Sequence, residues 1–255
     1  MIGFLDSGIG GLSVLREALT LMPNEDYIYY GDTENTPYGT KTRDEVKRLT
    51  FNAAGFLARH GIKALVVACN TATGAAVEDL RREFKFPVIG MEPAVKPAVE
   101  KSHNGGKRVL VLATALALKT EKFQNLVSRV DTDHIVDILP APKLVEFAER
   151  FVFKGAEVEA YLNELLPEGY VQGYDTLVLG CTHFPLFRQA LSEYLPPDIS
   201  IIDGNVGTIK HLHDVLKSRN LLSTASEKGQ VTFYKSGVQV TDRPTLENFY
   251  RILKM

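Results

Sequence analysis

The sequence holds two cysteines, and each directly follows a short apolar run. Cys69 follows residues 64–68 and Cys181 follows residues 176–180, and the two runs resemble each other. Two cysteines do not suggest a disulfide framework, and no Cys-x-x-Cys or His-x-x-x-His spacing predicts a structural zinc site. A single buried cysteine is usually a structural residue. Two cysteines at matching strand ends instead favour a pair of reactive thiols.

The residues beside the cysteines carry groups suited to proton transfer and to binding a carboxylate. Asn70, Thr71 and Thr182 supply amide and hydroxyl groups. His183 could exchange a proton with Cys181 or with a ligand. We expect each thiol to stand at the start of a helix, where the helix N-terminus lowers the thiol pKa from about 8.5. The alternative is that His183 merely caps a helix.

A duplicated thiol suggests a reaction with mirror symmetry, such as racemisation. One base removes the Cα proton from one face, and an acid on the opposite face returns a proton. A thiolate and a thiol can fill these roles and exchange them for the other enantiomer. No motif for pyridoxal phosphate is evident, although the sequence alone does not exclude a lysine that binds this cofactor.

Two polar segments follow the first two apolar runs. Residues 6–11 could form a tight turn with free N–H groups at a helix start, which attract an anion. They do not fit the G-x-G-x-x-G dinucleotide motif, so a small carboxylate fits as well as a phosphate. The alternative is a capping turn with Asp6 or Ser7 as the cap. Residues 31–39 are typical of a surface turn, but their position at the same sheet edge makes Tyr38 and Gly39 candidate ligand contacts.

Short apolar runs alternate with longer amphipathic stretches along the chain, which is typical of a parallel α/β protein. The predicted strands are residues 2–5, 27–30, 64–68, 87–90, 108–113, 134–139, 176–180 and 199–203. The predicted helices between them include residues 11–21 and 43–60. The C-terminal segment adds a helix at 207–218, a strand at 230–234 and a helix at 245–254.

The first four predicted strands and the second four resemble one unit used twice. We therefore predict an α/β fold with two similar, pseudo-symmetric lobes, mainly parallel sheets and an active site in the cleft between them. The predicted first lobe holds residues 1–97 and 207–255, and the second holds residues 98–206, with a polar linker at 101–107. Ligands bind beyond the carboxyl ends of such strands, so both thiols would face one cleft.

The composition of the 255-residue chain excludes several classes of protein. Lys and Arg total 29 against 31 for Asp and Glu, so no basic excess exists to bind a nucleic acid. The 45% of hydrophobic residues is ordinary for a globular protein. No apolar stretch approaches the ~20 residues that span a bilayer, and the chain opens without the pattern of a signal peptide. We expect no membrane association and a cytoplasmic location.

Several motifs, in order along the chain, resemble those of the cofactor-independent aspartate/glutamate racemases, and in particular the bacterial glutamate racemases. They are Asp6-Ser-Gly-Ile-Gly-Gly, Tyr30-Gly-Asp, Pro37-Tyr-Gly, Ala68-Cys-Asn-Thr-Ala, Val145-Glu146 and Leu179-Gly-Cys-Thr-His-Phe-Pro-Leu. The pairing of Cys69-Asn-Thr with Cys181-Thr-His is specific to this group.

The resemblance implies an enzyme that interconverts L-glutamate and D-glutamate without a cofactor or a metal, supplying D-glutamate for peptidoglycan and the cell wall. It implies that Cys69 and Cys181 transfer the protons, supported by Asp6 and His183 respectively. Glu146 is a further candidate catalytic residue, with an exposed helical acid as the alternative. Family members are commonly homodimers. The substrate-binding residues that the resemblance implies are Asp6, Ser7, Tyr38, Gly39, Asn70, Thr71, Thr114, Thr182 and His183.

Three positions depart from the motifs of the group. Ala117 stands where a second threonine is usual, Ala141 where a cysteine is common, and Val238 where an aspartate is usual. These changes leave the thiols untouched but leave the substrate preference open, so a racemase of another amino acid, such as aspartate, is an alternative. A non-catalytic amino-acid-binding protein is a second alternative, which the complete set of Cys, Asp and His residues disfavours.

Overall fold

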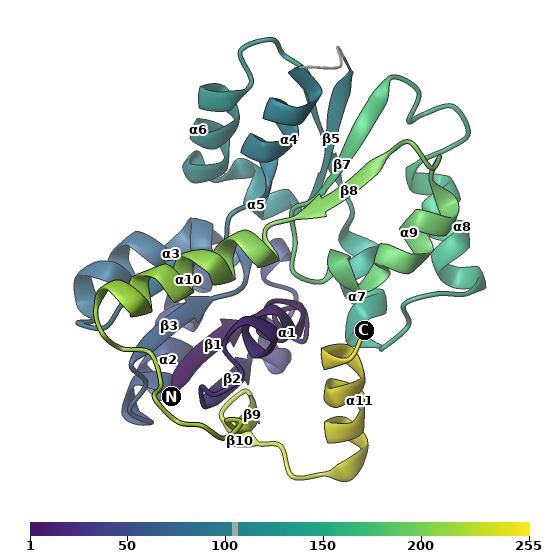
Figure 1. The fold of residues 1–255 in the computed structure, drawn as a ribbon. Helices are drawn as coiled ribbons and strands as arrows, with labels where there is room; N and C mark the ends of the chain where they lie inside the picture. The colour runs from purple at the N-terminus through teal and green to yellow at the C-terminus, as the bar shows by residue number, and fades with distance from the viewer. Residues whose placement is uncertain (104–106) are drawn as a thin grey trace.

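The chain builds two α/β lobes, each around one sheet (Figure 1). The computed structural model describes residues 1–103 and 107–255, apart from the side chains of His103 and Lys122. Residues 104–106 of the predicted linker lie outside the described residues. In spatial order, the strands of the first sheet are β10 (Val238–Gln239), β9 (Val231–Lys235), β2 (Tyr27–Gly31), β1 (Ile2–Asp6), β3 (Ala64–Val67) and β4 (Val88–Gly90). Those of the second sheet are β6 (Val136–Pro140), β5 (Arg108–Ala113), β7 (Tyr174–Leu179) and β8 (Ser200–Asp203).

The two sheets share one strand order. In each lobe the first strand lies between the second and the third, and the fourth strand pairs with the third. All of these pairs are parallel. The order β2-β1-β3-β4 is thus repeated as β6-β5-β7-β8. The predicted α/β fold, with a unit used twice and mainly parallel sheets, is confirmed.

Helices cover both faces of each sheet. Around the first sheet, α1 (Leu12–Leu21), α10 (Asn205–Ser218) and α11 (Arg243–Leu253) lie on one face, and α2 (Arg43–Arg59) and α3 (Asn70–Glu83) lie on the other. Around the second sheet, α7 (Pro142–Glu149), α8 (Ala156–Leu165) and α9 (Arg188–Tyr194) lie on one face, and α4 (Val95–His103) and α6 (Glu121–Val130) lie on the other. The shorter helical segments are η1 (Thr33–Asn35), η2 (Tyr38–Thr40), α5 (Ala115–Lys119) and η3 (Phe184–Phe187). Within the described residues, no helix combines the length and the apolar character needed to traverse a bilayer.

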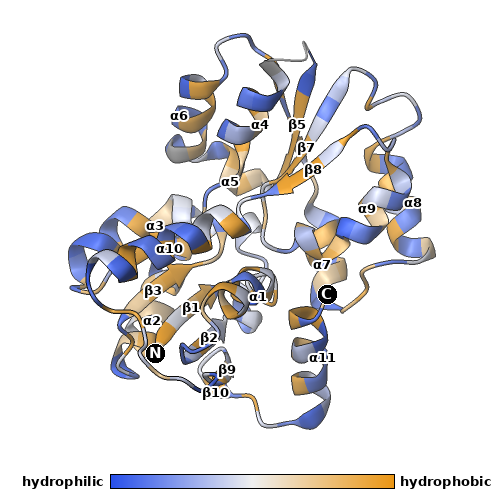
Figure 2. Cartoon of the chain, in the orientation of Figure 1, coloured by the Kyte–Doolittle hydropathy of each residue, from blue (hydrophilic) through white to orange (hydrophobic). Residues whose placement is uncertain are grey.

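Strand residues alternate between two apolar cores, because successive side chains of a strand point to opposite faces of the sheet. Phe4 of β1 packs into the core beneath α1, and its neighbour Leu5 packs into the core beneath α2 and α3. Figure 2 shows β1, β3 and β5 largely in orange and the helices with blue and orange faces. Strands β1, β2 and β3 are buried on both faces, as is β5 after Arg108, which explains why they read as continuous apolar runs in the sequence.

One apolar core continues from the first lobe into the second. It joins Phe4 and Leu15 of the first lobe to Leu112 and Phe187 of the second, and Met91 lies in it between the lobes. The two lobes therefore share packed side chains, and this packing fixes how they meet.

The chain crosses between the lobes twice. Residues 91–94 lead from β4 to α4, and Gly204 leads from β8 to α10. A Cβ atom on Gly204 would lie 2.1 Å from the backbone oxygen of Glu92, so the two crossovers touch where only glycine fits. The C-terminal segment then returns to the first lobe, where β9 pairs in parallel with β2 and both α10 and α11 pack on α1. The predicted lobe boundaries, at 97/98 and 206/207, stay a prediction.

Phe233 of β9 fixes the C-terminal segment to the first lobe, and its truncation tests this role. The side chain is 2% exposed, and its ring contacts the rings of Tyr29 and Phe249. We expect Phe233→Ala to lower the free energy of unfolding by about 3–5 kcal/mol, because it leaves a cavity in the core. Val238→Ala, at a position that is 69% exposed, should change it by less than about 0.5 kcal/mol. Urea denaturation measures both changes, and an equally small loss in the two variants would contradict the role of Phe233.

Candidate active site

The carboxyl ends of four strands bring the predicted site residues together from both lobes. Asp6 ends β1 and Cys69 follows β3 in the first sheet, while Thr114 follows β5 and Cys181 follows β7 in the second. All four side chains are buried. Parallel α/β sheets bind ligands at this edge, and here two such edges meet.

Cys69 caps the N-terminus of α3, so the predicted helix start is confirmed for this thiol. Its Sγ accepts a hydrogen bond from the backbone N–H of Ala72 at 3.5 Å. The thiol also donates to Ser7 Oγ at 3.8 Å. Ser7, which was predicted to bind the substrate, therefore lies directly beside the first thiol.

Burial raises the pKa of Cys69 to about 12, and the negative charge of Asp6 adds to this shift. The hydrogen bonds with Ala72 and Ser7 lower the pKa by less. The prediction of a lowered pKa is thus wrong for Cys69, because desolvation of the thiolate outweighs the helix N-terminus. The charge of Cys181 also contributes to the raised pKa, so the two thiols lie close enough to interact. Both cysteines are free thiols.

Cys181 does not stand at a helix start, and the prediction that it does is wrong. The chain turns at Cys181, continues as the short segment η3 and only then enters α9. The physical reason is Pro185, which has no N–H to donate to the carbonyl of Cys181, as an α-helix starting here would require. The group beside this thiol is instead His183, whose Nδ1 lies 3.7 Å from Cys181 Sγ.

His183 links Cys181 to a carboxylate. Its Nε2 lies 2.7 Å from Glu149 Oε1. Burial alone would lower the pKa of His183, but the hydrogen bonds and charges of Cys181 and Glu149 outweigh it and raise the pKa well above its ordinary value. A buried imidazolium at this place can stabilise a Cys181 thiolate or return a proton to it.

Glu149, rather than Glu146, is the acid of α7 that reaches the site. Its Oε1 accepts hydrogen bonds from His183 and from the backbone N–H of Ile9, the latter at 2.8 Å. Glu146 is exposed, so the geometry gives no support to a catalytic part for it. Helical periodicity could have identified Glu149, since it lies four residues after the buried Val145 and shares its face.

Asp6 is held by groups other than the thiol that it was predicted to support. Its Oδ2 accepts from the backbone N–H of Gly8 at 3.0 Å, and its Oδ1 accepts from Thr182 Oγ1 at 3.0 Å. The second bond crosses between the lobes. Asp6 therefore acts on Cys69 through its charge and on Thr182 through a direct hydrogen bond.

The glycines of the loop after β1 make room for the second lobe. A Cβ atom on Gly8 would lie 1.8 Å from Glu149 Oε1, and one on Gly10 would lie 2.4 Å from His183 Nδ1. Gly11 caps α1 without a side-chain hydrogen bond, so the alternative that Asp6 or Ser7 caps this helix is wrong. The loop thus packs closely against Glu149 and His183.

Thr114 brings together two further predicted residues, Thr71 and Gly39. Thr71 Oγ1 and Thr114 Oγ1 lie 2.9 Å apart, which joins α3 of the first lobe to the second lobe. A Cβ atom on Gly39 would lie 2.8 Å from Thr114 Cβ, so the turn that carries Gly39 packs tightly on the same residue. Tyr38 is buried, and its hydroxyl donates to Asp32 Oδ2 at 2.6 Å.

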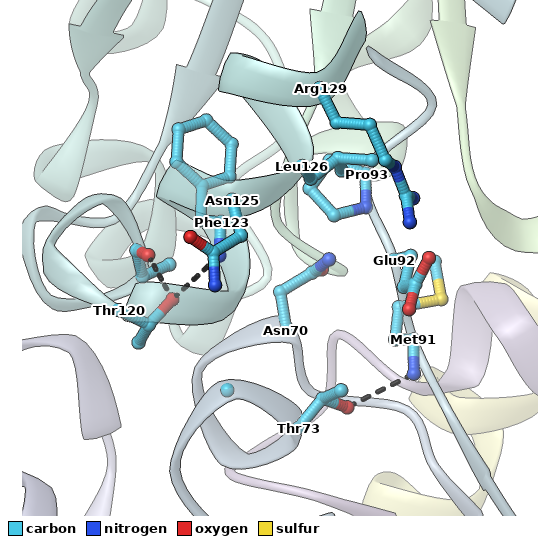
Figure 3. A pocket seen from close by; sticks show the side chains of 12 residues that line it. Asn70, Thr73, Met91, Glu92, Pro93, Thr120, Phe123, Asn125, Leu126 and Arg129 are labelled. Carbon is cyan, nitrogen blue, oxygen red and sulfur yellow. Dashed lines mark hydrogen bonds between the residues drawn. The ribbon is translucent and has the colours of Figure 1, made fainter. Parts of the chain in front are cut away.

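The side-chain amide of Asn70 is buried without a hydrogen-bond partner among the described residues. It is 9% exposed, and neither Nδ2 nor Oδ1 has a hydrogen-bond partner among the described residues. Figure 3 shows the amide pointing into a cavity of about 300 Å³ that Thr120, Glu92 and Arg129 also line. A buried amide without partners costs stability, so it is typical of a group that binds a ligand.

The three departures from the family motifs lie in different surroundings. The backbone N–H of Ala117 donates to Thr114 Oγ1 at 3.3 Å, and Ala117 lines the cavity of Figure 3. Ala141 is fully buried just before α7, whereas Val238 is exposed on β10.

Among the described residues, no group of three His, Cys, Asp or Glu side chains could hold a metal ion.

The raised pKa of His183 depends on Glu149, and a matched pair of variants tests this. We expect Glu149→Gln to lower the pKa of His183 by about one to two units, because the variant removes a charged hydrogen-bond partner while burial still opposes the imidazolium. Glu146→Gln, on the exposed face of the same helix, should leave the pKa unchanged. Titration of the histidine ring signals by NMR measures both values. Equal shifts in the two variants would contradict the assignment to Glu149.

The raised pKa of Cys69 predicts that its thiolate forms only at strongly alkaline pH in the ligand-free protein. Since the pKa is about 12, we expect no midpoint before about pH 10, compared with about 8.5 for an ordinary thiol. The measurement is the ultraviolet absorbance of the thiolate in Cys181→Ser. The variant that lacks both thiols supplies the blank for tyrosine ionisation. A midpoint near the ordinary value would show that burial does not control this thiol.

Comparison with known proteins identifies the family to which this chain is similar. A family model described as Asp/Glu/Hydantoin racemase matches residues 12–212, which include both thiols. The glutamate racemase of Halothermothrix orenii is 53% identical to this chain, over 99% of this chain and 98% of that protein. Glutamate racemase 2 of Bacillus subtilis is 50% identical, over 100% of this chain and 95% of that protein.

Solved structures agree with these relatives across both lobes. The glutamate racemase of Francisella tularensis in complex with D-glutamate has a TM-score of 0.82 at 28% identity, covering 100% of this chain and 93% of that chain. The Escherichia coli glutamate racemase, in complex with L-glutamate and the activator UDP-MurNAc-ala, has a TM-score of 0.80 at 29% identity, covering 99% of this chain and 94% of that chain. Because the match to the family model includes both strand-end thiols and the relatives cover nearly the whole chain, the protein belongs to the Asp/Glu/Hydantoin racemase family.

Proposed function

We propose that this protein is a glutamate racemase, an isomerase that interconverts L-glutamate and D-glutamate. The observation that carries the proposal is the pair of buried free thiols, Cys69 and Cys181, which follow equivalent strands of the two lobes and lie in one site. A reaction that removes a proton from one face of Cα and adds one to the other needs two such groups. The sequence relatives named above act on glutamate by name, which favours glutamate over aspartate.

In the proposed mechanism, each thiol serves one face of the substrate. In one direction the Cys181 thiolate takes the Cα proton and becomes a thiol, while the Cys69 thiol gives its proton to the opposite face and becomes a thiolate. The reverse direction exchanges these roles, so no net proton is gained or lost by the substrate. The high pKa of Cys69 suits it to the protonated, donating role before the first transfer.

The two thiols receive different support. The imidazolium of His183, 3.7 Å from Cys181 Sγ, stabilises the Cys181 thiolate, and Glu149 keeps the imidazolium charged. At Cys69 the backbone N–H of Ala72 stabilises the thiolate that forms when this thiol has given up its proton. Asp6 holds Thr182 beside Cys181 and supplies a negative charge that can attract the substrate ammonium group.

Neutral polar groups are the proposed partners of the substrate carboxylates. The hydroxyls are those of Ser7, Thr71 and Thr114, whereas the Thr182 hydroxyl donates its proton to Asp6. Asn70 is a further proposed partner, because its amide N–H groups have no partner among the described residues; its amide points into the cavity of Figure 3, which neither thiol lines. Such donors bind carboxylates without the cost of burying a further charge.

Some predictions from the sequence remain proposals. We propose that the D-glutamate serves peptidoglycan synthesis and that the protein works as a homodimer in the cytoplasm. Sedimentation equilibrium tests the dimer.

The substrate is tested by incubating the protein with single enantiomers of glutamate and of aspartate in heavy water. We expect optical rotation to disappear and deuterium to enter Cα for both glutamate enantiomers, with aspartate slower by at least tenfold. Faster exchange of aspartate would overturn the assignment of glutamate. Binding of either amino acid without exchange would overturn racemisation itself.

The two-thiol mechanism predicts that Cys69→Ser and Cys181→Ser each lower the racemisation rate by roughly 10²–10⁴-fold, because each removes one general acid–base group. The loss should be similar in both directions, since every turnover uses both thiols. Circular dichroism confirms that the variants are folded. An equimolar mixture of the two variants serves as a control and should be no more active than the single variants, because each site uses two thiols of one chain. A variant that racemises near the wild-type rate would contradict the mechanism.

A further inference from the structure

Asp32 is a buried carboxylate that the mechanism does not use. It follows β2 and is 4% exposed. Its Oδ2 accepts from Tyr38 Oη at 2.6 Å, and its Oδ1 accepts from Ser236 Oγ at 3.1 Å. Asn35 Nδ2 donates to both oxygens, at 2.9 and 3.1 Å. A buried carboxylate needs donors of this kind, so its position depends on them.

Ser236 comes from the distant C-terminal segment. It lies between β9 and β10 and is 204 residues away from Asp32 in the sequence. Its hydroxyl donates to Asp32 and accepts from the backbone N–H of Glu34 at 3.0 Å. Its own N–H donates to the backbone oxygen of Gly31 at 2.9 Å. Ser236 thus ties the hairpin of the tail to the start of the turn that carries Tyr38.

The turn fixed in this way forms one wall of the site. Tyr38 is 1% exposed, and its hydroxyl is committed to Asp32. Gly39 packs on Thr114, which in turn lies 2.9 Å from Thr71 Oγ1. A displacement of Asp32 would therefore move Tyr38 and Gly39 relative to the hydroxyls next to Cys69.

We infer that Ser236 is a positioning residue of the active site, which acts through Asp32 to set Tyr38 and Gly39 for substrate binding. The inference rests on the proposed function, because it takes this wall to contact the substrate. Val238, two residues further along the hairpin, is 69% exposed and faces away from this network.

Two substitutions of Ser236 remove the hydroxyl in different backbone contexts. Ser236 has a φ of +44°, a conformation that strains alanine but not glycine. Ser236→Ala and Ser236→Gly therefore both remove the hydroxyl, but only the alanine variant has a strained backbone. We expect both to raise the KM for glutamate about tenfold, the effect of one hydrogen bond to a charged group, with kcat changed less than about threefold. Val238→Ala is the matched control on the same hairpin and should leave KM and kcat unchanged.

A double-mutant cycle with Tyr38→Phe tests the route through Asp32. Tyr38→Phe removes the hydroxyl that Asp32 holds, so Ser236→Ala should raise KM less than about twofold further in that background. An equal, multiplicative effect in both backgrounds would overturn the inference. So would a lowered melting temperature with an unchanged KM, or a loss confined to kcat. A wild-type protein without racemase activity would instead refute the proposed function. An active wild-type protein whose Ser236→Gly variant has an unchanged KM would refute only this inference.

Discussion

The site depends on one carboxylate that the two lobes share. Glu149 Oε1 accepts from the backbone of Ile9 in the first lobe and from His183 in the second. The glycine at position 8 is a condition for this contact, because a side chain there would overlap the carboxylate. The same oxygen therefore joins the lobes, orients the imidazole and, together with Cys181, keeps it charged. The chemistry at Cys181 and the packing of the lobes cannot be varied independently.

The periodicity of the sequence predicted nearly every strand, because strands buried on both faces are apolar throughout. The surroundings of the site were harder to predict. Matching strand ends predicted matching helix starts, but Pro185 removes the N–H that a helix at Cys181 needs. The place of Glu149 in the site could have been predicted from its spacing to Val145. The contact of Ser236 with Asp32, in contrast, joins residues 204 positions apart. No local pattern carries such a contact, since it arises only when β9 pairs with β2.

A symmetric fold here carries unlike thiols. Both cysteines follow the third strand of their sheets, yet Cys69 meets a helix N-terminus and a serine, and Cys181 meets a histidine. The duplicated backbone places the two sulfur atoms, while side chains particular to each lobe surround them. A racemase needs equal access to two mirror-image substrates, but it does not need two identical bases. The reaction requires only that one thiolate accept the Cα proton while the other thiol donates a proton to the opposite face.

The pairing of β9 with β2 has a consequence for synthesis of the chain. β2 is complete by Gly31, but the strand that covers its edge ends at Lys235. While the ribosome makes the residues between them, this edge of the first sheet has no partner from the same chain. An uncovered parallel edge is open to association with other nascent chains. The newly made first lobe is thus vulnerable for most of its translation, and it becomes complete only as the last helix leaves the ribosome.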